Sequence, residues 1–263
     1  MDDADLVLDS DRIEATLLAG RGTRGGYSLV IGGTTQSHVN PDDPTDLQLE
    51  YVRLATAAID AAFDAGAPVR ALHLGGGALT IPRYLAHTRP GSPQHVVELF
   101  GELYEFVVDA VPLPAGSIVT EEFDDARRAV ERAEPGSRDL VVVDVFSGSS
   151  APAHCTTVEF FAAAARLLAP GGLLVVNTLL SSGADFTREV AATLAAVLPE
   201  LAVVAPEANL GAAPVGNIVL AASDRPLDVD RLGEALAFEH RPVVVLTGDY
   251  ARGFIGDAAV RSD

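Results

Sequence analysis

Three consecutive glycines, Gly75 to Gly77, directly follow a short apolar run and precede a helical pattern. Glycine lets a ligand approach the backbone closely, and the N–H groups that begin a helix favour an anionic group. The acid Glu98 follows 23 residues after Gly75, near the spacing at which a carboxylate binds both hydroxyls of a ribose. NAD is disfavoured because Thr80 stands where a dinucleotide fingerprint has its third glycine. We predict that Gly75, Gly76, Gly77 and Glu98 bind a nucleoside, with a tight turn that holds no ligand as the alternative.

Two further carboxylates follow the next two expected strands. Asp125, with Asp124 as an adjacent competitor, is placed to accept a hydrogen bond from an adenine amino group. The alternative for Asp125 is an acid at a helix N-terminus that the helix dipole stabilises. Asp144 ends the apolar run Leu140–Val143, where a charge is costly unless it faces a crevice. These acids favour an S-adenosyl nucleoside as the ligand and a functional role for Asp144.

The remaining nucleophilic and metal-binding side chains are few. His73 lies inside an expected strand and is predicted to be a hydrogen-bonded core residue. His154 and Cys155 share a loop, but no other residue supports a Cys/His nucleophile. Cys155 is the single cysteine, which excludes an internal disulfide, and no Cys/His cluster has the spacing of zinc ligands. We expect no metal.

The region before residue 45 has the pattern of a small antiparallel sheet. Polar and apolar residues alternate from Arg12 to Val39, and glycines interrupt the alternation as they do in hairpin turns. An amphipathic helix is expected next, at Leu47–Ala65. We predict a small N-terminal β region over residues 1–45 and a Rossmann-like catalytic domain over residues 46–263. The expected N-terminal strands are Ile13–Leu18, Tyr27–Ile31 and Thr35–Val39.

Beyond Pro68, short apolar runs alternate with helical patterns, which is typical of a parallel sheet covered by helices on both faces. We predict an α/β Rossmann-like fold of the S-adenosylmethionine-dependent methyltransferase type, with a mostly parallel seven-stranded sheet and an antiparallel edge. Thr156 and Glu159 are expected to form a capping box at one helix. The seven strands are Val69–Leu74, His95–Glu98, Ser117–Thr120, Leu140–Asp144, Leu173–Asn177, Leu201–Ala205 and Asn217–Ala222, the last two forming a hairpin, and a short strand follows at Val243–Leu246. The helices are Leu79–His87, Glu102–Val111, Asp124–Ala133, the capped helix ending at Leu168, and Phe186–Val197.

The composition excludes several classes of partner. The chain has 263 residues, and 37 acidic residues against 18 basic ones give a formal charge of −19. Such a charge repels nucleic acids and anionic membranes. The apolar runs are far shorter than the about 20 residues that span a bilayer, and the acidic N-terminus is unlike a signal peptide. We expect a soluble cytoplasmic protein that binds neither nucleic acid nor membrane.

The order of these features resembles the spermidine synthase family of polyamine aminopropyltransferases, especially its actinobacterial branch. The resemblance covers about residues 32–222. Its most specific segments are HLGGGALTIPRY (73–84), VVEL (96–99), DLVVVDVFSG (139–148) and APAHCTTVEFF (151–161). It implies a small N-terminal β region before a Rossmann-like domain, a homodimer, and transfer of an aminopropyl group from decarboxylated S-adenosylmethionine to a small-molecule amine such as putrescine.

The resemblance also implies roles for individual residues. Asp144 matches the family's catalytic aspartate, which would act as the base that takes a proton from the amine. Ser147 stands at the second acid of the family's D-x-x-D pair, and Tyr51 matches the tyrosine of its Y-H-E pattern, so both would contact the amine substrate. The implied cosubstrate-binding residues are Gln36, Gly75, Gly76, Gly77, Glu98, Asp125 and Ala126.

The chain departs from the family pattern where a cationic polyamine is expected to bind. Ala78-Leu79 replaces an aspartate-glycine pair that holds the transferred amine, Ser147 replaces an aspartate, and Val52-Arg53 replaces histidine-glutamate. Each change removes or reverses a charge. A methyltransferase that uses intact S-adenosylmethionine and a non-catalytic homologue that binds a nucleoside or a protein partner are therefore the alternatives to an aminopropyltransferase.

Overall fold

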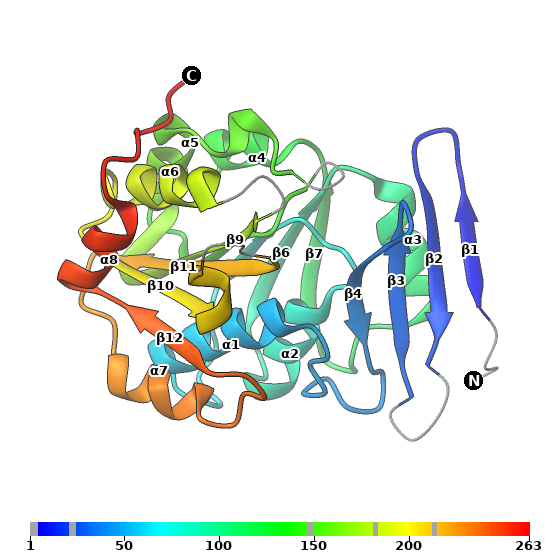
Figure 1. Cartoon of the computed structure of the whole chain (residues 1–263). Coiled ribbons are helices and arrows are strands. Elements are labelled where there is room, and N and C mark those ends of the chain that lie inside the picture. The colour runs from blue at the N-terminus through cyan, green and yellow to red at the C-terminus, as the bar shows by residue number, and fades with distance from the viewer. Residues whose placement is uncertain (1–4, 21–24, 147–149, 181–183, 212–214) are drawn as a thin grey trace.

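The structure is a computed structural model, and it describes residues 5–20, 25–146, 150–180, 184–211 and 215–263. A small antiparallel sheet, blue in Figure 1, lies beside a larger sheet with helices on both faces. Within the described residues, no helix is both long enough and apolar enough to cross a membrane.

The small sheet has the order β1-β2-β3-β4, and each strand is antiparallel to its neighbour. Its strands are Leu6–Asp9 (β1), Glu14–Ala19 (β2), Tyr27–Ile31 (β3) and Thr34–Val39 (β4). The residues that alternate inward, such as Leu17 and Leu29, are fully buried and pack against Leu103 and Val107 of helix α3 (Gly101–Ala110). Strand β1 was not predicted, because three of its four residues are exposed and it carries no pattern of burial.

The large sheet has eight strands in the order β12-β10-β11-β9-β8-β5-β6-β7. Strands β11 and β12 run opposite to the others, so the predicted mixed fold with a mostly parallel sheet is confirmed. The predicted number of seven strands was wrong, since the short last strand, β12, pairs with β10 and adds an eighth strand to the sheet. The strands are Ala71–Leu74 (β5), Pro93–Glu98 (β6), Ile118–Phe123 (β7), Arg138–Val143 (β8), Leu168–Leu179 (β9), Glu200–Pro206 (β10), Asn217–Ser223 (β11) and Val243–Leu246 (β12).

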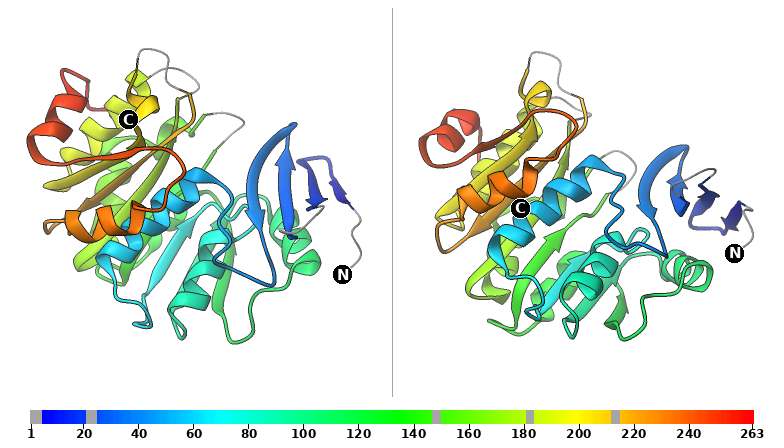
Figure 2. Two further views of the ribbon diagram at one scale, coloured as in Figure 1. Left: turned by 60° about the horizontal axis from the view of Figure 1, so that its bottom comes forward. Right: turned by 90° about the horizontal axis from the view of Figure 1, so that it is seen from below.

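Helices cover both faces of this sheet, as Figure 2 shows from two further directions. One face packs against α1 (Glu50–Ala62), α2 (Thr80–Thr88), α3 and α7 (Val229–Leu236). The other face packs against α4 (Ala126–Arg132), α5 (Val158–Leu167), α6 (Ala184–Ala195) and α8 (Gly248–Ile255). Because both faces are buried, the central strands are continuous apolar runs, and all four residues of β5 are buried.

Several predicted helix starts were displaced, among them those of α5 and α4. Helix α5 begins after Thr157, whose side chain accepts a hydrogen bond from Phe160 N, whereas the Thr156 hydroxyl donates to Ala153 O. The expected capping box of Thr156 and Glu159 is therefore wrong by one residue. Helix α4 begins at Ala126, because β7 continues to Phe123 and Asp125 caps the helix.

Candidate functional site

The glycine turn between β5 and α2 lies against the end of β8. Gly75 has φ +94°, and a Cβ placed on it would lie 2.2 Å from the carbonyl oxygen of Asp144. The two strands are joined there by a hydrogen bond of 2.9 Å from Asp144 N to Leu74 O. Only glycine fits a position with this backbone angle and this contact, so the turn and Asp144 are fixed side by side.

Glu98 ends β6 and faces the same turn. Its Oε2 accepts a hydrogen bond of 2.8 Å from Gly76 N, and its Oε1 accepts one of 3.1 Å from Phe100 N. The residue is 8% exposed. A carboxylate oxygen has two lone pairs, so each oxygen keeps one for a further donor. The backbone therefore holds Glu98 in an orientation that suits a pair of ribose hydroxyls.

Asp144 follows β8 and is held by groups from two other elements. Asn177 Nδ2 donates to Asp144 Oδ1 at 2.8 Å, and the Tyr51 hydroxyl also lies within hydrogen-bonding reach. Burial raises the pKa of Asp144, while the bond from Asn177 and the nearby Tyr51 hydroxyl act in the opposite direction, and the negative charge of Glu98 raises it further. Asp144 is therefore a better proton acceptor than an ordinary aspartate.

A chain of amides orients Asn177. Asn217 Nδ2 donates to Asn177 Oδ1 at 3.0 Å, which turns the Asn177 NH₂ group toward Asp144. Asn209 Nδ2 donates to the backbone oxygen of Asn217 at 2.9 Å, so Asn217 is also held in place. Sequence reasoning missed Asn177, although the rule that selected Asp144 applies to it too, since it is polar and follows the buried run 173–176 of β9.

Strand β4 of the small sheet closes over the turn. The Tyr51 hydroxyl donates to Gln36 O at 3.1 Å, and a Cβ on Gly77 would lie 2.6 Å from Ser37 Oγ. The Thr80 hydroxyl donates to His38 O at 2.8 Å, so the residue that replaces the third glycine attaches α2 to β4. Burial, and then the charge of Asp144, raise the pKa of Tyr51 well above its ordinary value, so its hydroxyl stays protonated. Ser37 was not predicted.

Asp125 lies at the N-terminus of α4, with Ala126 buried beside it. Its Oδ1 accepts hydrogen bonds from the Arg127 and Arg128 amides at 3.0 and 3.3 Å, and its Oδ2 lies 2.8 Å from His154 Nε2. Asp125 therefore caps helix α4, which is the alternative role that the sequence left open for this residue. Its Oδ2 still has a lone pair for an adenine amino group.

His154 and Cys155, which are adjacent in the loop after β8, lie beside Asp125. The ligand atoms of these three residues are all within 4.8 Å of one another. Burial raises the pKa of the Cys155 thiol to about 12, and the charge of Asp125 adds to this effect. The thiol is therefore protonated at neutral pH, which does not suit a nucleophile.

The residues that depart from the family pattern lie in different surroundings. Ala78 is fully buried against the small sheet, and Leu79, in the position of the family glycine, has φ +58°. Arg53 points to Glu239, with its Nε 2.8 and 3.0 Å from the two carboxylate oxygens. The charge of Arg53 is therefore neutralised by a residue far along the chain. Ser147 lies outside the described residues.

His73 is 2% exposed, and its Nε2 lies 2.9 Å from Gln94 Oε1. Burial lowers the pKa of His73 to about 4, so the ring is neutral. The prediction that His73 is a hydrogen-bonded core residue is confirmed. It lies on the α1 and α2 face of the sheet, two residues before the glycine turn.

Several known proteins are similar to this chain in sequence. Two curated relatives are described as polyamine aminopropyltransferases. The one from Vibrio vulnificus is 29% identical over 53% of this chain and 47% of its own length. The one from Chromobacterium violaceum is 28% identical over 57% of each. The matched region thus spans about half the length of these relatives, and no family model matches the chain.

Solved structures extend the similarity over almost the whole chain. A structure described as a probable spermidine synthase from Corynebacterium glutamicum is 32% identical, with a TM-score of 0.90 over 98% of this chain and 95% of that one. A spermidine synthase in complex with the transition-state analogue AdoDATO has a TM-score of 0.63 at 14% identity, and covers 95% of this chain and 84% of that one. Human methyltransferase-like protein 13 in complex with SAH has a TM-score of 0.54 at 18% identity, and covers 71% of this chain and 86% of that one. The last two support the fold alone.

Proposed function

This chain belongs to the spermidine synthase family, and we propose that it is an aminopropyltransferase that uses decarboxylated S-adenosylmethionine and an amine such as putrescine. The observation that carries the proposal is the position of Asp144, whose backbone lies against the glycine turn at the carboxyl end of the sheet and whose carboxylate accepts a hydrogen bond from Asn177. In this proposal residues 46–263 form the catalytic domain, and residues 1–45 form a β region that closes over it.

The nucleoside half of the cosubstrate would bind across the ends of three strands. Glu98 would accept hydrogen bonds from the ribose hydroxyls with the lone pairs that Gly76 and Phe100 leave free. Asp125, with Ala126, would face the adenine from the start of α4. Gln36 and the turn residues Gly75 to Gly77 would line the sulfonium end, because β4 covers that turn.

The proposed reaction is an in-line displacement at the carbon attached to sulfur. The amine lone pair forms the new C–N bond while the C–S bond breaks, and its electron pair stays on sulfur, which leaves as a neutral thioether, methylthioadenosine. The attacking amine must give up a proton, and Asp144 would accept it. The raised pKa of Asp144 suits this role, because a base is most effective when its pKa approaches the working pH.

The charges around Asp144 support a cationic substrate. The carboxylates of Asp144 and Glu98 are close enough to interact electrostatically, and an amine and a sulfonium are both positively charged. Arg53 does not oppose this field, because Glu239 neutralises it. Tyr51, which contacts both Gln36 and Asp144, would bind the acceptor amine beside the base.

One observation favours a methyltransferase as the second candidate. Ala78 is buried and uncharged at the position where the family holds the amine of the transferred group. A methyl donor has no such requirement at that position, but it carries a methionine carboxylate, which the two acids near the turn would repel.

Calorimetry and turnover assays separate the candidates. The aminopropyltransferase should bind decarboxylated S-adenosylmethionine more tightly than S-adenosylmethionine, and should release methylthioadenosine when putrescine is added. Asp144→Asn should lower turnover about 10²- to 10⁴-fold while nucleoside affinity stays nearly unchanged. A preference for intact S-adenosylmethionine with methyl transfer would establish the second candidate, and binding without turnover would indicate a non-catalytic homologue.

Two further expectations accompany this proposal. The family resemblance implies a homodimer, and the composition predicts a cytoplasmic location; both stay predictions. Light scattering after size-exclusion chromatography measures the first directly, since a dimer has twice the mass of the 27.3 kDa chain. A monomer that retains turnover would remove the dimer from the proposed function.

A further inference from the structure

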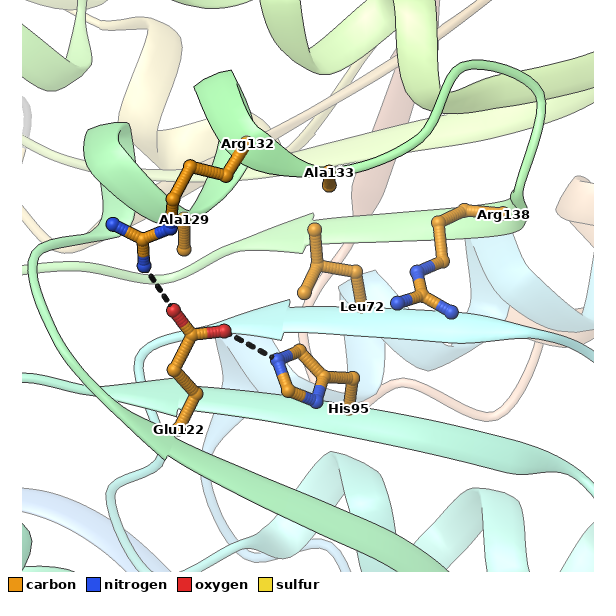
Figure 3. Close-up of a pocket in the computed structure, with 7 residues that line it drawn as sticks. All are labelled: Leu72, His95, Glu122, Ala129, Arg132, Ala133 and Arg138. Carbon is orange, nitrogen blue, oxygen red and sulfur yellow. Dashed lines mark hydrogen bonds and ion pairs between the residues drawn. The ribbon is translucent and has the colours of Figure 1, made fainter.

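A cavity of about 200 Å³ lies between helix α4 and the face of the large sheet that α4 covers. It is separate from the proposed nucleoside site, because none of the glycine turn, Glu98, Asp144 and Asn177 lines it. Figure 3 shows side chains of both signs of charge around it. Its lining residues are Leu72, His95, Glu122, Ala129, Arg132, Ala133 and Arg138.

One side of the cavity is a closed network of charges. Glu122 accepts a hydrogen bond from Arg132 with one oxygen and lies 2.9 Å from His95 Nε2 with the other. Arg132 also donates to Asp124 Oδ2 at 2.7 Å, and His95 Nδ1 lies 2.9 Å from the Thr120 hydroxyl. Among the described residues that line the cavity, Glu122 is the single acid, and both its oxygens are already bonded.

Arg138, on the other side, has no counterpart for its charge. Its guanidinium points into the cavity beside Leu72, and within the described part of the chain its side chain has no ion-pair partner (Figure 3). Its Nε is buried with no hydrogen-bond partner. The nearby Arg70 is also cationic, and its own charge is committed to Asp139 at 2.6 Å. A buried donor without an acceptor is costly, so the position favours an acceptor from outside the chain.

We propose that this cavity binds a small oxyanion, with Arg138 as its principal ligand. A guanidinium presents a planar set of N–H donors that matches a phosphate or carboxylate, and Arg132 has further N–H groups not used by Glu122 and Asp124. The volume is below the roughly 300 to 1,000 Å³ of pockets for drug-sized ligands, so an ion or a very small acid is the expected occupant. In a chain of net charge −19, such a site must be made locally by its own cations.

The test is a titration of the full chain in a chloride buffer at constant ionic strength. Inorganic phosphate, sulfate and acetate are the three probes, and calorimetry with thermal denaturation is the measurement. At least one probe should bind saturably and raise the melting temperature. A tetrahedral ion that binds best would identify a phosphate-type site, and acetate would identify a carboxylate site.

Arg138→Gln should weaken this binding about tenfold or more, because it removes the charge and most of the donors. Arg138→Lys keeps the charge but loses the planar set of donors, and it should give an intermediate loss even if the glutamine variant folds poorly. The matched control is Arg128→Gln, since Arg128 is an exposed arginine near the start of helix α4, with its side chain 73% exposed. Equal binding by all four proteins, or no saturable binding by the unmodified chain, would overturn the proposal.

Discussion

The side-chain amide of Asn177 donates a 2.8 Å hydrogen bond to Oδ1 of Asp144, and this bond joins the carboxyl ends of β9 and β8. Asn177 cannot rotate freely, because its own oxygen accepts from Asn217. The partly buried carboxylate therefore keeps a fixed donor, and its pKa reflects a balance between burial, which raises it, and this donor, which lowers it. The proposed base depends on that balance.

Asn177→Ala should shift the acidic limb of the pH profile of kcat/KM to higher pH. The donor stabilises the ionised form of Asp144, so removing it raises the pKa of Asp144 and leaves less carboxylate at a given pH. A hydrogen bond to a charged group contributes roughly 1.5 to 3 kcal/mol, so the expected shift is about one to two pH units. Asn217→Ala should shift the limb in the same direction by less. If the acidic limb of the profile has the same position in both variants as in the unmodified chain, these amides do not control the pKa of the proposed base.

Asp144→Asn should make the folded chain more stable at pH 8, on the order of 1 kcal/mol. Burial raises the pKa of Asp144 above its unfolded value, so folding favours the protonated form. The stability that protonation contributes is complete below the unfolded pKa and is lost as the pH rises through the folded pKa. The advantage of the variant should therefore shrink as the pH falls from 8 toward the ordinary pKa of an aspartate. Urea unfolding at several pH values measures it, and an advantage that grows toward low pH would contradict the burial argument.

Glu98→Gln should weaken the binding of decarboxylated S-adenosylmethionine and methylthioadenosine about tenfold or more. The amide keeps the shape of the carboxylate but loses its charge and one acceptor oxygen, so the bonds to the ribose hydroxyls weaken. Glu121→Gln removes the same charge from an exposed position on the neighbouring strand β7 and is the matched control. Calorimetry should show a loss for Glu98→Gln alone, and similar affinities in both variants would exclude the ribose role.

Gly75→Ala should destabilise the fold by about 2 kcal/mol or more. Its φ of +94° is unfavourable for alanine, and the new Cβ would collide with the Asp144 carbonyl oxygen. Gly233→Ala is the control, because Gly233 lies inside helix α7 with open space around it. That change should stabilise the chain by about 0.5 to 1 kcal/mol. Denaturant unfolding of both variants tests the contrast, and a neutral Gly75→Ala would show that the turn adapts.

Arg53→Gln should lower stability by about 1 to 3 kcal/mol, since it leaves Glu239, with its side chain 10% exposed, without its cation. The KM for putrescine should stay the same, because the charge of Arg53 is already neutralised. Arg241→Gln, which removes an arginine that is 52% exposed and pairs with Glu50, is the control for an exposed ion pair. A clearly lower KM for the diamine in Arg53→Gln would instead place Arg53 in the acceptor site.

Local patterns identified most of the large sheet and several residues of the site. Glycines and acids that directly follow buried strands are visible in the sequence, because burial on both faces makes each strand a continuous apolar run. Gly75, Glu98 and Asp144 were found by this rule, and the structure brings them together. The same rule would have found Asn177, if a neutral amide had been given the weight of an acid.

The sequence by itself determined the class of fold and the succession of most strands along the chain. It also showed which strands are followed by an acid. The tertiary structure alone decided which of these groups touch: Asn217 behind Asn177, β4 over the glycine turn, and Glu239 against Arg53. These contacts join residues 40, 42 and 186 positions apart. Periodicity and capping depend on neighbours within a few residues, whereas hydrogen bonds between distant segments depend on how whole strands and helices pack, and this is why the sequence pattern did not reveal them.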